Sequence, residues 1–542
     1  MRKFFLIFFT FILSCSENQV IIWENYDETQ EIEENSYHSI SRMRYKRIQS
    51  LTTNKNEIFK PFHEFLKTYD IKYHNSLKEL IINQNILSIQ SNISKGIFNY
   101  EDLVKFYIYR IYSFEMDQDL YLNSIISFNP DVINQAKELD RKNIPDNALY
   151  GIPILVKDNI NVNGMVTSAG ASAFKNNFVS TNATVINNLK KNNTLILGKL
   201  NMSEWAYYFC RPCPVGYSSL GGQTLNPYGR KIFESGGSSS GSGVSIASNF
   251  AAASIGTETS GSILSPSSKN SLVGLKPTIG SISRSGIVPI SSFFDTAGPM
   301  TKNVYDNALL FNSMIGYDDK DILSYEAERI DLDEMTNFNP KNIIVGISSN
   351  YSNDSLIKIA LMDLNKIGIS SVLYNFEQYS LPSFRSILTS DMKRDLPNYI
   401  SKYASEEIKT LNVEDIIVFN NNDTLLHAPY GQYLFNQIKE DKVSDSELNQ
   451  MKITTKSRAA DYLKKIMTVY NLDVFVSVDN GMAGIAAAAH FPALTVPMGY
   501  RDDGEPSNIT FITTSKNEQL LYNIGYVYEK QSKRRVSPKK YN

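Results

Sequence analysis

Cysteine and histidine are scarce in this sequence, which has three and five of them among 542 residues. Cys210 and Cys213 are close neighbours, but two ligands cannot complete a zinc site, and no second cluster of cysteine or histidine lies near them. We therefore expect no metal ion and no cofactor. In an oxidising compartment this pair would form a local disulfide or remain as two idle thiols.

The chain also lacks an excess of charge of either sign, since its formal net charge is −2. Nucleic-acid binding usually requires a basic surface, so we expect no nucleic-acid partner. Hydrophobic residues at 42% and charged residues at 20% are typical of an ordinary globular protein. No apolar run reaches the length of a transmembrane helix, which is about 20 residues.

One short apolar run does occur, at the amino terminus. Arg2 and Lys3 precede the apolar residues 4–13, and the small residues Ser14 and Cys15 follow. This pattern is typical of a secretory signal. The segment "ILSC" resembles a bacterial lipoprotein box, in which Cys15 would carry the lipid and tether the protein to a membrane. We expect a periplasmic or cell-surface lipoprotein; the alternative is an ordinary cleaved signal and a secreted soluble protein.

The rest of the chain predicts one large α/β domain, because helical and strand patterns alternate without an internal repeat. Asn99 is expected to cap one amphipathic helix, and Asn129 another with Pro130 in its first turn. The oligomeric state stays open. The predicted divisions are a signal peptide at 1–15, a polar tether at 16–38, a helical preamble at 39–96, the main domain at 97–535 and a frayed tail at 536–542.

The central stretch, residues 234–278, contains two glycine- and serine-rich clusters, "GGSSSGSG" and "GTETSGSI", with an apolar segment between them. The first cluster could open a helix, and the second could form a tight turn that aims backbone N–H groups at one point. Serine hydroxyls and backbone donors would then converge, as acyl transfer requires. Such sequence is usually a flexible linker, but a linker would not be followed by a long run of alternating apolar and small residues.

Several serine chemistries fit poorly. Residues 237–241, "GSSSG", match a nucleophile elbow with Ser239 at its centre, but no buried strand precedes them. Only His427 and His490 follow, and His490 lies in apolar sequence that favours a core position. The K-T-G element of penicillin-binding proteins and the G-K-[ST] end of a phosphate loop are both absent. A serine with a lysine as its base remains, and Lys157 ends the apolar strand predicted at 152–156.

The sequence resembles the amidase signature family of amide hydrolases over roughly residues 95–535. The matching segments are "GIPILVKDNI", "GKLNMSEWA", "GGSSSGSG", "GTETSGSI" and "VGLKPT". The spacing is specific, because Ser238 and Ser262 are 24 positions apart, as the catalytic serines of that family are. The resemblance implies a single domain built around a large mixed sheet.

The resemblance also implies a Ser–Ser–Lys triad and metal-free hydrolysis through an acyl-serine. Ser262 would be the nucleophile, Ser238 the bridging serine after a cis peptide bond, and Lys157 a base whose pKa burial lowers from about 10.4. The family often has glycine where Ser260 stands, so a side chain would border the pocket here. The implied oxyanion hole consists of the backbone N–H groups of Thr259, Ser260, Gly261 and Ser262.

Within the family, "GYSSLGGQTLNPY" and "SRSGIVPISSFFDTAGPM" resemble the peptide amidases, which release the C-terminal amide of a peptide as ammonia. The resemblance therefore implies a linear small-molecule or peptide amide as substrate. Other small amides or fatty-acid amides are alternatives, although the charged preamble does not favour a membrane-docking helix. A signal sequence disfavours an amidotransferase subunit, and the intact triad disfavours an inactive binding protein on the same scaffold.

Overall fold

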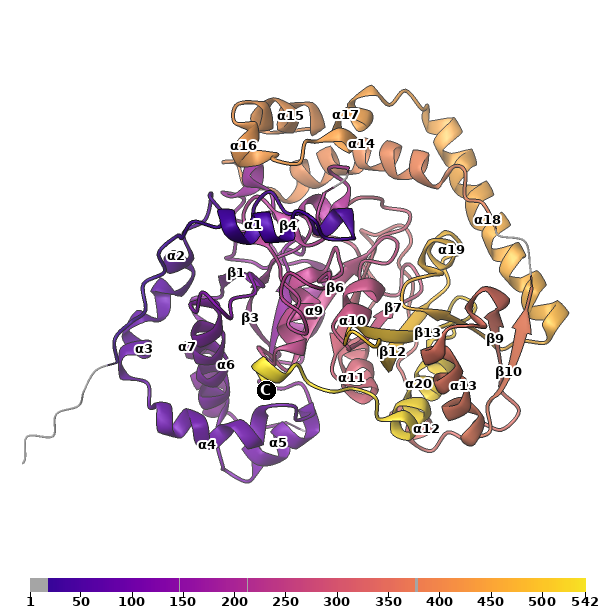
Figure 1. The fold of residues 1–542 in the computed structure, drawn as a ribbon, viewed down its shortest axis with the longest axis horizontal. Coiled ribbons are helices and arrows are strands. Elements are labelled where there is room, and N and C mark those ends of the chain that lie inside the picture. The colour runs from indigo at the N-terminus through magenta and orange to yellow at the C-terminus, as the bar shows by residue number, and fades with distance from the viewer. Residues whose placement is uncertain (1–17, 146, 212, 376–378) are drawn as a thin grey trace, which may run out of the picture.

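A mixed sheet of eleven strands forms the centre of the molecule (Figure 1), in the order β1-β3-β2-β6-β8-β7-β12-β13-β11-β9-β10. The computed structural model describes residues 18–145, 147–211, 213–375 and 379–542, so Cys15 and the predicted signal segment lie outside it. The strands are β1 (Ile125–Phe128), β2 (Pro153–Lys157), β3 (Leu195–Leu200), β6 (Ala253–Glu258), β7 (Val273–Lys276), β8 (Thr296–Thr301), β9 (Ile344–Ser348), β10 (Ser370–Tyr374), β11 (Val474–Val478), β12 (Ala493–Tyr500) and β13 (Pro506–Ile512), with a separate pair β4 (Tyr217–Ser218) and β5 (Gly222–Gln223).

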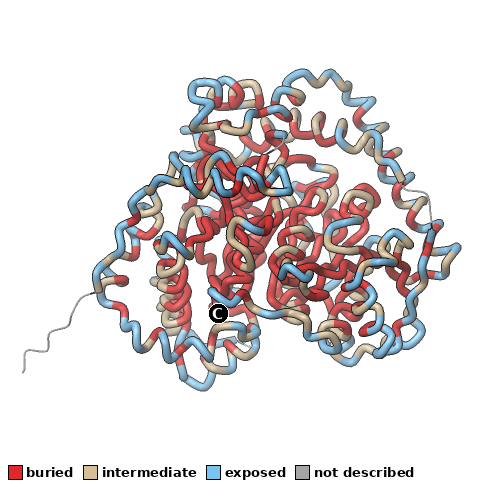
Figure 2. Tube along the Cα trace, in the orientation of Figure 1, coloured by how far each residue is buried: buried red, intermediate tan, exposed pale blue. Residues whose placement is uncertain are grey.

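Helices cover both faces of this sheet, as the alternation of side chains along β12 shows. Thr495 faces α10, where its hydroxyl lies 3.3 Å from the Ser268 hydroxyl. Leu494 and Val496 point the other way, toward Gly525 of α20. Helices α14–α17 form a further layer above one end of the sheet, and α18 runs from that layer down toward β10 (Figure 1). The buried residues concentrate in the sheet and the helices on it (Figure 2).

The described helices have these bounds: α1 (Thr29–Asn35), α2 (Lys55–Phe59), α3 (His63–Thr68), α4 (Ile71–Ile81), α5 (Ile86–Ser94), α6 (Tyr100–Glu115), α7 (Val132–Asp140), α8 (Thr184–Lys191), α9 (Ser240–Ala247), α10 (Leu264–Lys269), α11 (Val304–Met314), α12 (Leu332–Thr336), α13 (Ser355–Lys366), α14 (Phe384–Tyr403), α15 (Val413–Asn421), α16 (Thr424–His427), α17 (Tyr433–Glu440), α18 (Asp445–Tyr470), α19 (Ala483–Ala488) and α20 (Glu518–Ser532).

Two predicted helix starts have different outcomes. Asn99 caps α6 as predicted: its side chain accepts a hydrogen bond from Asp102 N, and the Asp102 carboxylate accepts one from Asn99 N. The prediction for Asn129 was wrong by two residues, because α7 begins after Asp131. Asn129 instead accepts a hydrogen bond from Asp131 N, which makes a turn just before the helix.

The prediction of a loose tether before residue 39 was wrong for the described part of that segment. The Asn18 side chain donates to Tyr69 O at 2.8 Å, and Trp23 is buried with its N–H bonded to Asn56 at 2.7 Å. The Glu28 carboxylate accepts hydrogen bonds from the backbone N–H groups of residues 48 and 49. Buried aromatic surface and paired polar groups therefore hold this polar segment on the body.

The prediction of a frayed carboxyl end was also wrong. Tyr541 lies in a short 3₁₀ helix, η6 (Lys539–Tyr541), and is fully buried. Its hydroxyl donates to Leu120 O at 2.7 Å, and its carbonyl accepts a hydrogen bond from the buried Arg110 at 2.5 Å. A buried guanidinium requires acceptors, and the tail supplies one of them.

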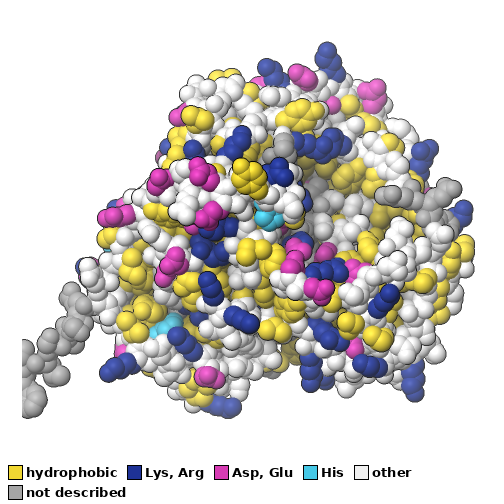
Figure 3. Space-filling model, in the orientation of Figure 1, with side chains coloured by type: hydrophobic (Ala, Val, Ile, Leu, Met, Phe, Trp, Pro, Cys, Tyr) yellow, Lys and Arg dark blue, Asp and Glu magenta, His cyan; other side chains and the backbone are white. Residues whose placement is uncertain are grey.

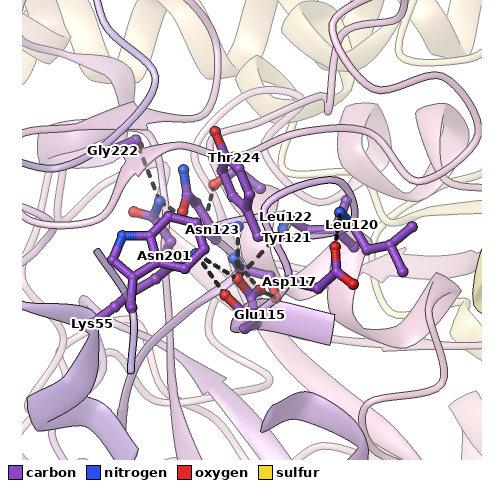
Figure 4. Close-up of polar contacts among 12 residues, drawn as sticks. Lys55, Glu115, Asp117, Leu120, Tyr121, Leu122, Asn123, Asn201, Gly222 and Thr224 are labelled. Carbon is purple, nitrogen blue, oxygen red and sulfur yellow. Dashed lines mark hydrogen bonds and ion pairs between the residues drawn. The ribbon is translucent and has the colours of Figure 1, made fainter. Parts of the chain in front are cut away.

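The segment 115–124, between α6 and β1, is where the amino-terminal part meets the body (Figure 4). The Glu115 carboxylate accepts hydrogen bonds from Asn123 N and Ser124 N, and Lys55 pairs with it at 3.4 Å. Asn123 O in turn accepts a hydrogen bond from the Asn201 side chain at 2.9 Å. The preamble is therefore connected by polar contacts to the loop after β3.

Candidate active site

Two neighbouring parallel strands, β2 and β6, bring the predicted base to the second serine cluster. Val156 pairs with Ile255, so the carboxyl ends of both strands meet at one edge of the sheet. Lys157 is the last residue of β2, and its Nζ donates to Thr257 Oγ1 at 2.8 Å and to Thr257 O at 3.2 Å. The register of the sheet thus decides what surrounds this lysine.

The Lys157 amine lies 2.8 Å from Ser238 Oγ, and both side chains are fully buried. Burial lowers the pKa of Lys157 to about 7, because the desolvated cation is costly, while the negative charges of Asp295 and Glu258 raise it in part. A large fraction of this lysine is therefore neutral near pH 7, when its nitrogen has a free electron pair.

The loop before α9 presents Ser238, and close packing restricts the residues around it. The Gly237–Ser238 peptide bond is cis. Gly236 has a φ of +65°, and a Cβ atom there would lie 2.6 Å from Pro266 Cα, so only glycine fits. Ser203 N donates to Ser238 O at 3.0 Å, which fixes the loop from its other side.

Ser239, the centre of the apparent nucleophile elbow, is occupied in holding Thr257. Its hydroxyl donates to Thr257 O at 3.0 Å and accepts from Thr257 N at 3.2 Å. Its backbone N–H donates to Ser262 O at 3.1 Å, and this bond joins the two serine clusters. The histidine expected of such an elbow is elsewhere: His490 is buried with its ring centroid 4.6 Å from that of Phe293.

Ser262 lies at the end of the turn 259–262, which follows β6 and precedes α10. It is 9% exposed, whereas Ser238 is fully buried, so Ser262 is the more accessible of the two serines. The Glu258 carboxylate lies behind the turn and accepts hydrogen bonds from Ile263 N at 2.7 Å and Leu264 N at 2.9 Å. These bonds hold the backbone immediately after Ser262.

Asp295 anchors the opposite end of the same turn. Its carboxylate accepts a hydrogen bond from Thr259 Oγ1 at 2.5 Å, and the N–H groups of Ile290 and Ser291 donate to its other oxygen. Burial raises the pKa of Asp295 to about 6, and these hydrogen bonds lower it in part. Asp295 thus connects the turn to the segment before β8.

Thr257 and Asp295 had no predicted role at the site, and Ser239 was considered only as the nucleophile of an elbow. All three lie in motifs quoted above, but their contacts depend on which strands are neighbours.

Cys210 and Cys213 are disulfide-bonded. Within the described ranges, no group of three histidine, cysteine or acidic side chains could hold a metal ion, and no helix is both long and apolar enough to cross a membrane.

The arrangement can transfer a proton from a serine to a buried amine beside a turn that is rich in backbone donors.

A model of the amidase family matches residues 102–458. A probable amidase of Arabidopsis thaliana is 30% identical over 442 residues, which cover 77% of this chain and 85% of that protein. The A subunit of the glutamyl-tRNA(Gln) amidotransferase of Pediococcus pentosaceus is 29% identical, over 77% of this chain and 90% of that one.

Solved structures give the same result. An amidase family protein from Bacillus anthracis superposes with a TM-score of 0.86 and 33% identity, over 91% of this chain and all of that one. The native peptide amidase from Stenotrophomonas maltophilia superposes with a TM-score of 0.79 and 30% identity, over 84% of this chain and 98% of that one. The chain is therefore a member of the amidase signature family, whose enzymes act on C–N bonds of amides.

Proposed function

We propose that this amidase hydrolyses linear carboxamides to a carboxylic acid and ammonia through an acyl intermediate on Ser262, with Ser238 and Lys157 as a proton relay. The observation that carries the proposal is the 2.8 Å distance between Lys157 Nζ and Ser238 Oγ in a fully buried setting. A neutral amine has two N–H groups and one electron pair. Thr257 O and Oγ1 accept the two N–H groups, so the electron pair is left for the Ser238 hydroxyl.

In the acylation step, Lys157 takes the proton of Ser238 as Ser238 takes that of Ser262. The Ser262 oxygen then attacks the amide carbonyl, and the carbonyl π electrons move onto its oxygen. Backbone N–H groups of the turn 259–262 would stabilise this oxyanion. As the tetrahedral intermediate collapses, the C–N bond breaks, the relay returns its proton to the nitrogen, and ammonia leaves.

In the second half, water replaces ammonia. The neutral Lys157 again accepts a proton through Ser238, and the resulting hydroxide attacks the Ser262 ester. The C–O bond to Ser262 breaks, the serine recovers its proton, and the acid is released. The sum is one amide and one water converted to one acid and one ammonia, so no further reactant is needed.

As substrate we propose the C-terminal amide of a peptide. The likeness to the peptide amidase from Stenotrophomonas maltophilia, over 84% of this chain, supports this choice. The same enzyme has been solved with the competitive inhibitor chymostatin. Simple aliphatic or fatty amides are the alternative substrates of the same chemistry.

The test is ammonia release by the purified protein from amidated peptides, short aliphatic amides and long-chain amides. Hydrolysis confined to the amidated peptides is the expected result. The Ser262→Ala variant should release ammonia at least about 10³-fold more slowly than the wild type. Its circular dichroism spectrum should be unchanged, which shows that the variant folds. Ser239→Ala, on the adjacent residue, should retain measurable turnover, because Ser239 only holds Thr257. Activity of the Ser262 variant at the wild-type rate would refute the mechanism.

We also propose that Cys15 carries the lipid that tethers the protein to a membrane outside the cytoplasm. The motif "ILSC" after a charged start and an apolar run supports this location. Expression of the full chain in a bacterium fed radiolabelled palmitate tests it. The wild type should be labelled and should sediment with membranes. The Cys15→Ala variant should carry no label and should not sediment with membranes.

A further inference from the structure

A cavity of about 340 Å³ opens beside the candidate active site, and four tyrosines line it: Tyr351, Tyr374, Tyr379 and Tyr462. We call it the tyrosine pocket. It lies where α18 descends past α19 to the β9–β10 edge of the sheet (Figure 1). The described residues that line it include no charged side chain. Its volume is within the range of about 300–1,000 Å³ that is usual for small-molecule sites.

The segment 480–484 separates this pocket from the turn 259–262 by the width of one residue. Gly484 lines the pocket, and a Cβ atom there would lie 3.8 Å from Ser260 Oγ and 3.8 Å from Leu381 Cδ1. A Cβ atom on Gly261 would lie 2.9 Å from the Asn480 amide nitrogen. Ser260, two residues before the proposed nucleophile Ser262, therefore lies against the glycine that lines the pocket.

Aromatic rings give the pocket a defined shape. The rings of Tyr379 and Tyr462 lie 4.8 Å apart at an interplanar angle of 32°. Tyr374 donates its hydroxyl hydrogen to Met482 Sδ at 3.7 Å, and a side chain at Gly481 would collide with the Tyr351 hydroxyl. Rings of this kind bind another ring by its face or edge and tolerate apolar groups. A charged group would lose hydration there, and the described lining residues offer it no opposite charge.

Figure 3 shows that the face of the molecule is hollowed between the upper helices and the strands below them. Charged side chains of both signs are interspersed over this face. The tyrosine pocket differs from that surface because none of its described lining residues is charged. This difference indicates that the pocket selects one kind of side chain.

We propose that the tyrosine pocket binds the side chain of the residue that carries the amide, and that it favours an aromatic or large apolar side chain. This inference rests on the proposed function: the departing group is ammonia, which is too small to fill the pocket, so the acyl part must occupy it. A filled pocket holds the carbonyl carbon against Ser262. The preference therefore shows in kcat/KM.

The experiment measures ammonia release from four N-acetyl amino-acid amides, those of phenylalanine, leucine, alanine and lysine. We expect kcat/KM for the phenylalanine and leucine amides to exceed that for the alanine amide by roughly 10- to 100-fold, and the lysine amide to be slowest. Gly484→Leu places a side chain between the pocket and Ser260 and should reduce the phenylalanine-to-alanine ratio toward one. Leucine also favours the helix more than glycine does, so α19 should form.

Tyr462→Ala is the second variant, and it removes one aromatic wall without filling the passage. The same ratio should fall at least fivefold. The matched control is Tyr317→Ala, on a tyrosine that is 61% exposed and outside the pocket, and it should leave every rate unchanged. A ratio near one in the wild type, or a ratio that survives both pocket variants, would overturn the inference while ammonia release still upheld the proposed function. A folded wild type that hydrolyses none of the four amides would instead count against the function itself.

Discussion

The ionisation of one residue, Lys157, should set the pH dependence of this amidase. Burial lowers its pKa to about 7, so the neutral amine that accepts a proton is present above pH 7 and is lost as the pH falls. We expect kcat/KM to rise about tenfold per pH unit below pH 6.5 and to level off above pH 7.5. Stopped ammonia assays between pH 5 and pH 9 measure it. A profile that is flat from pH 5 to pH 8 would contradict a lysine base.

Lys157→Arg is the matched variant for this profile. A guanidinium stays protonated at every pH of the assay, so it can neither accept the Ser238 proton nor titrate. The variant should lose activity by a factor of at least 10³ throughout the range. Because the guanidinium does not titrate in this range, any residual activity of the variant should lack the acid limb that the wild type shows.

Asp295 acts on the same lysine at a distance and is therefore a positioning residue. It holds Thr259 by a 2.5 Å hydrogen bond, and its charge raises the pKa of Lys157. Asp295→Asn removes the charge, so the acid limb of the kcat/KM profile should move to lower pH. The new amide group would also point one N–H at a backbone N–H, and two donors cannot bond each other. Because this disturbs the turn, kcat should fall roughly 10- to 100-fold, equivalent to about 1.4–2.7 kcal/mol. Asp423→Asn, at the exposed cap of α16, should change neither quantity. If kcat falls but the acid limb of the kcat/KM profile stays at the same pH, the effect of Asp295 is structural alone.

At the scale of elements, the parts that depend on local pattern were predictable and those that depend on distant contacts were not. The α6 cap and the buried strand β2 follow from neighbouring residues, and both occur as expected. The carboxyl tail has polar sequence, yet Tyr541 is buried because Arg110, 431 positions away, needs its carbonyl. The same holds at the site, where Asp295 is brought to Thr259 by the pairing of β6 with β8.

The tail should therefore contribute to stability as an element. Tyr541→Ala removes a fully buried ring and its hydrogen bond to Leu120 O. We expect the free energy of unfolding to fall by about 3 kcal/mol, as for other large buried aromatic side chains. Urea denaturation followed by circular dichroism measures it. Lys539→Ala, on an exposed residue of the same 3₁₀ helix, should change this free energy by less than about 0.5 kcal/mol.

At the scale of the whole molecule, both ends of the described chain pack against the segment 115–124. The Lys55 ammonium contacts the rings of both Trp23 and Tyr121, at 4.1 and 4.2 Å from their centroids. The Tyr541 hydroxyl donates to the adjacent Leu120 O, and Arg230 lies over the Tyr121 ring at 4.8 Å. At the end of this segment, Ser124 O accepts a hydrogen bond from Asn201 N. Asn201 O in turn accepts one from Gly241 N, in the first turn of α9 after Ser238.

The two ends should therefore be thermodynamically coupled. Trp23→Ala removes one of the two rings that the Lys55 ammonium contacts and opens the buried site of Trp23 to water. The free energy of unfolding should therefore fall by about 3 kcal/mol. Because Trp23 contacts Tyr121 and Tyr541 contacts Leu120, each loss loosens the support of the other end. The double variant Trp23→Ala/Tyr541→Ala should then differ from the sum of the single effects by at least about 0.5 kcal/mol. The control cycle pairs Trp23→Ala with Tyr374→Ala, which lies at the far edge of the sheet and should be additive. Additivity in both cycles would mean that the ends are held independently, and the segment 115–124 would then be rigid enough to bind each without the other.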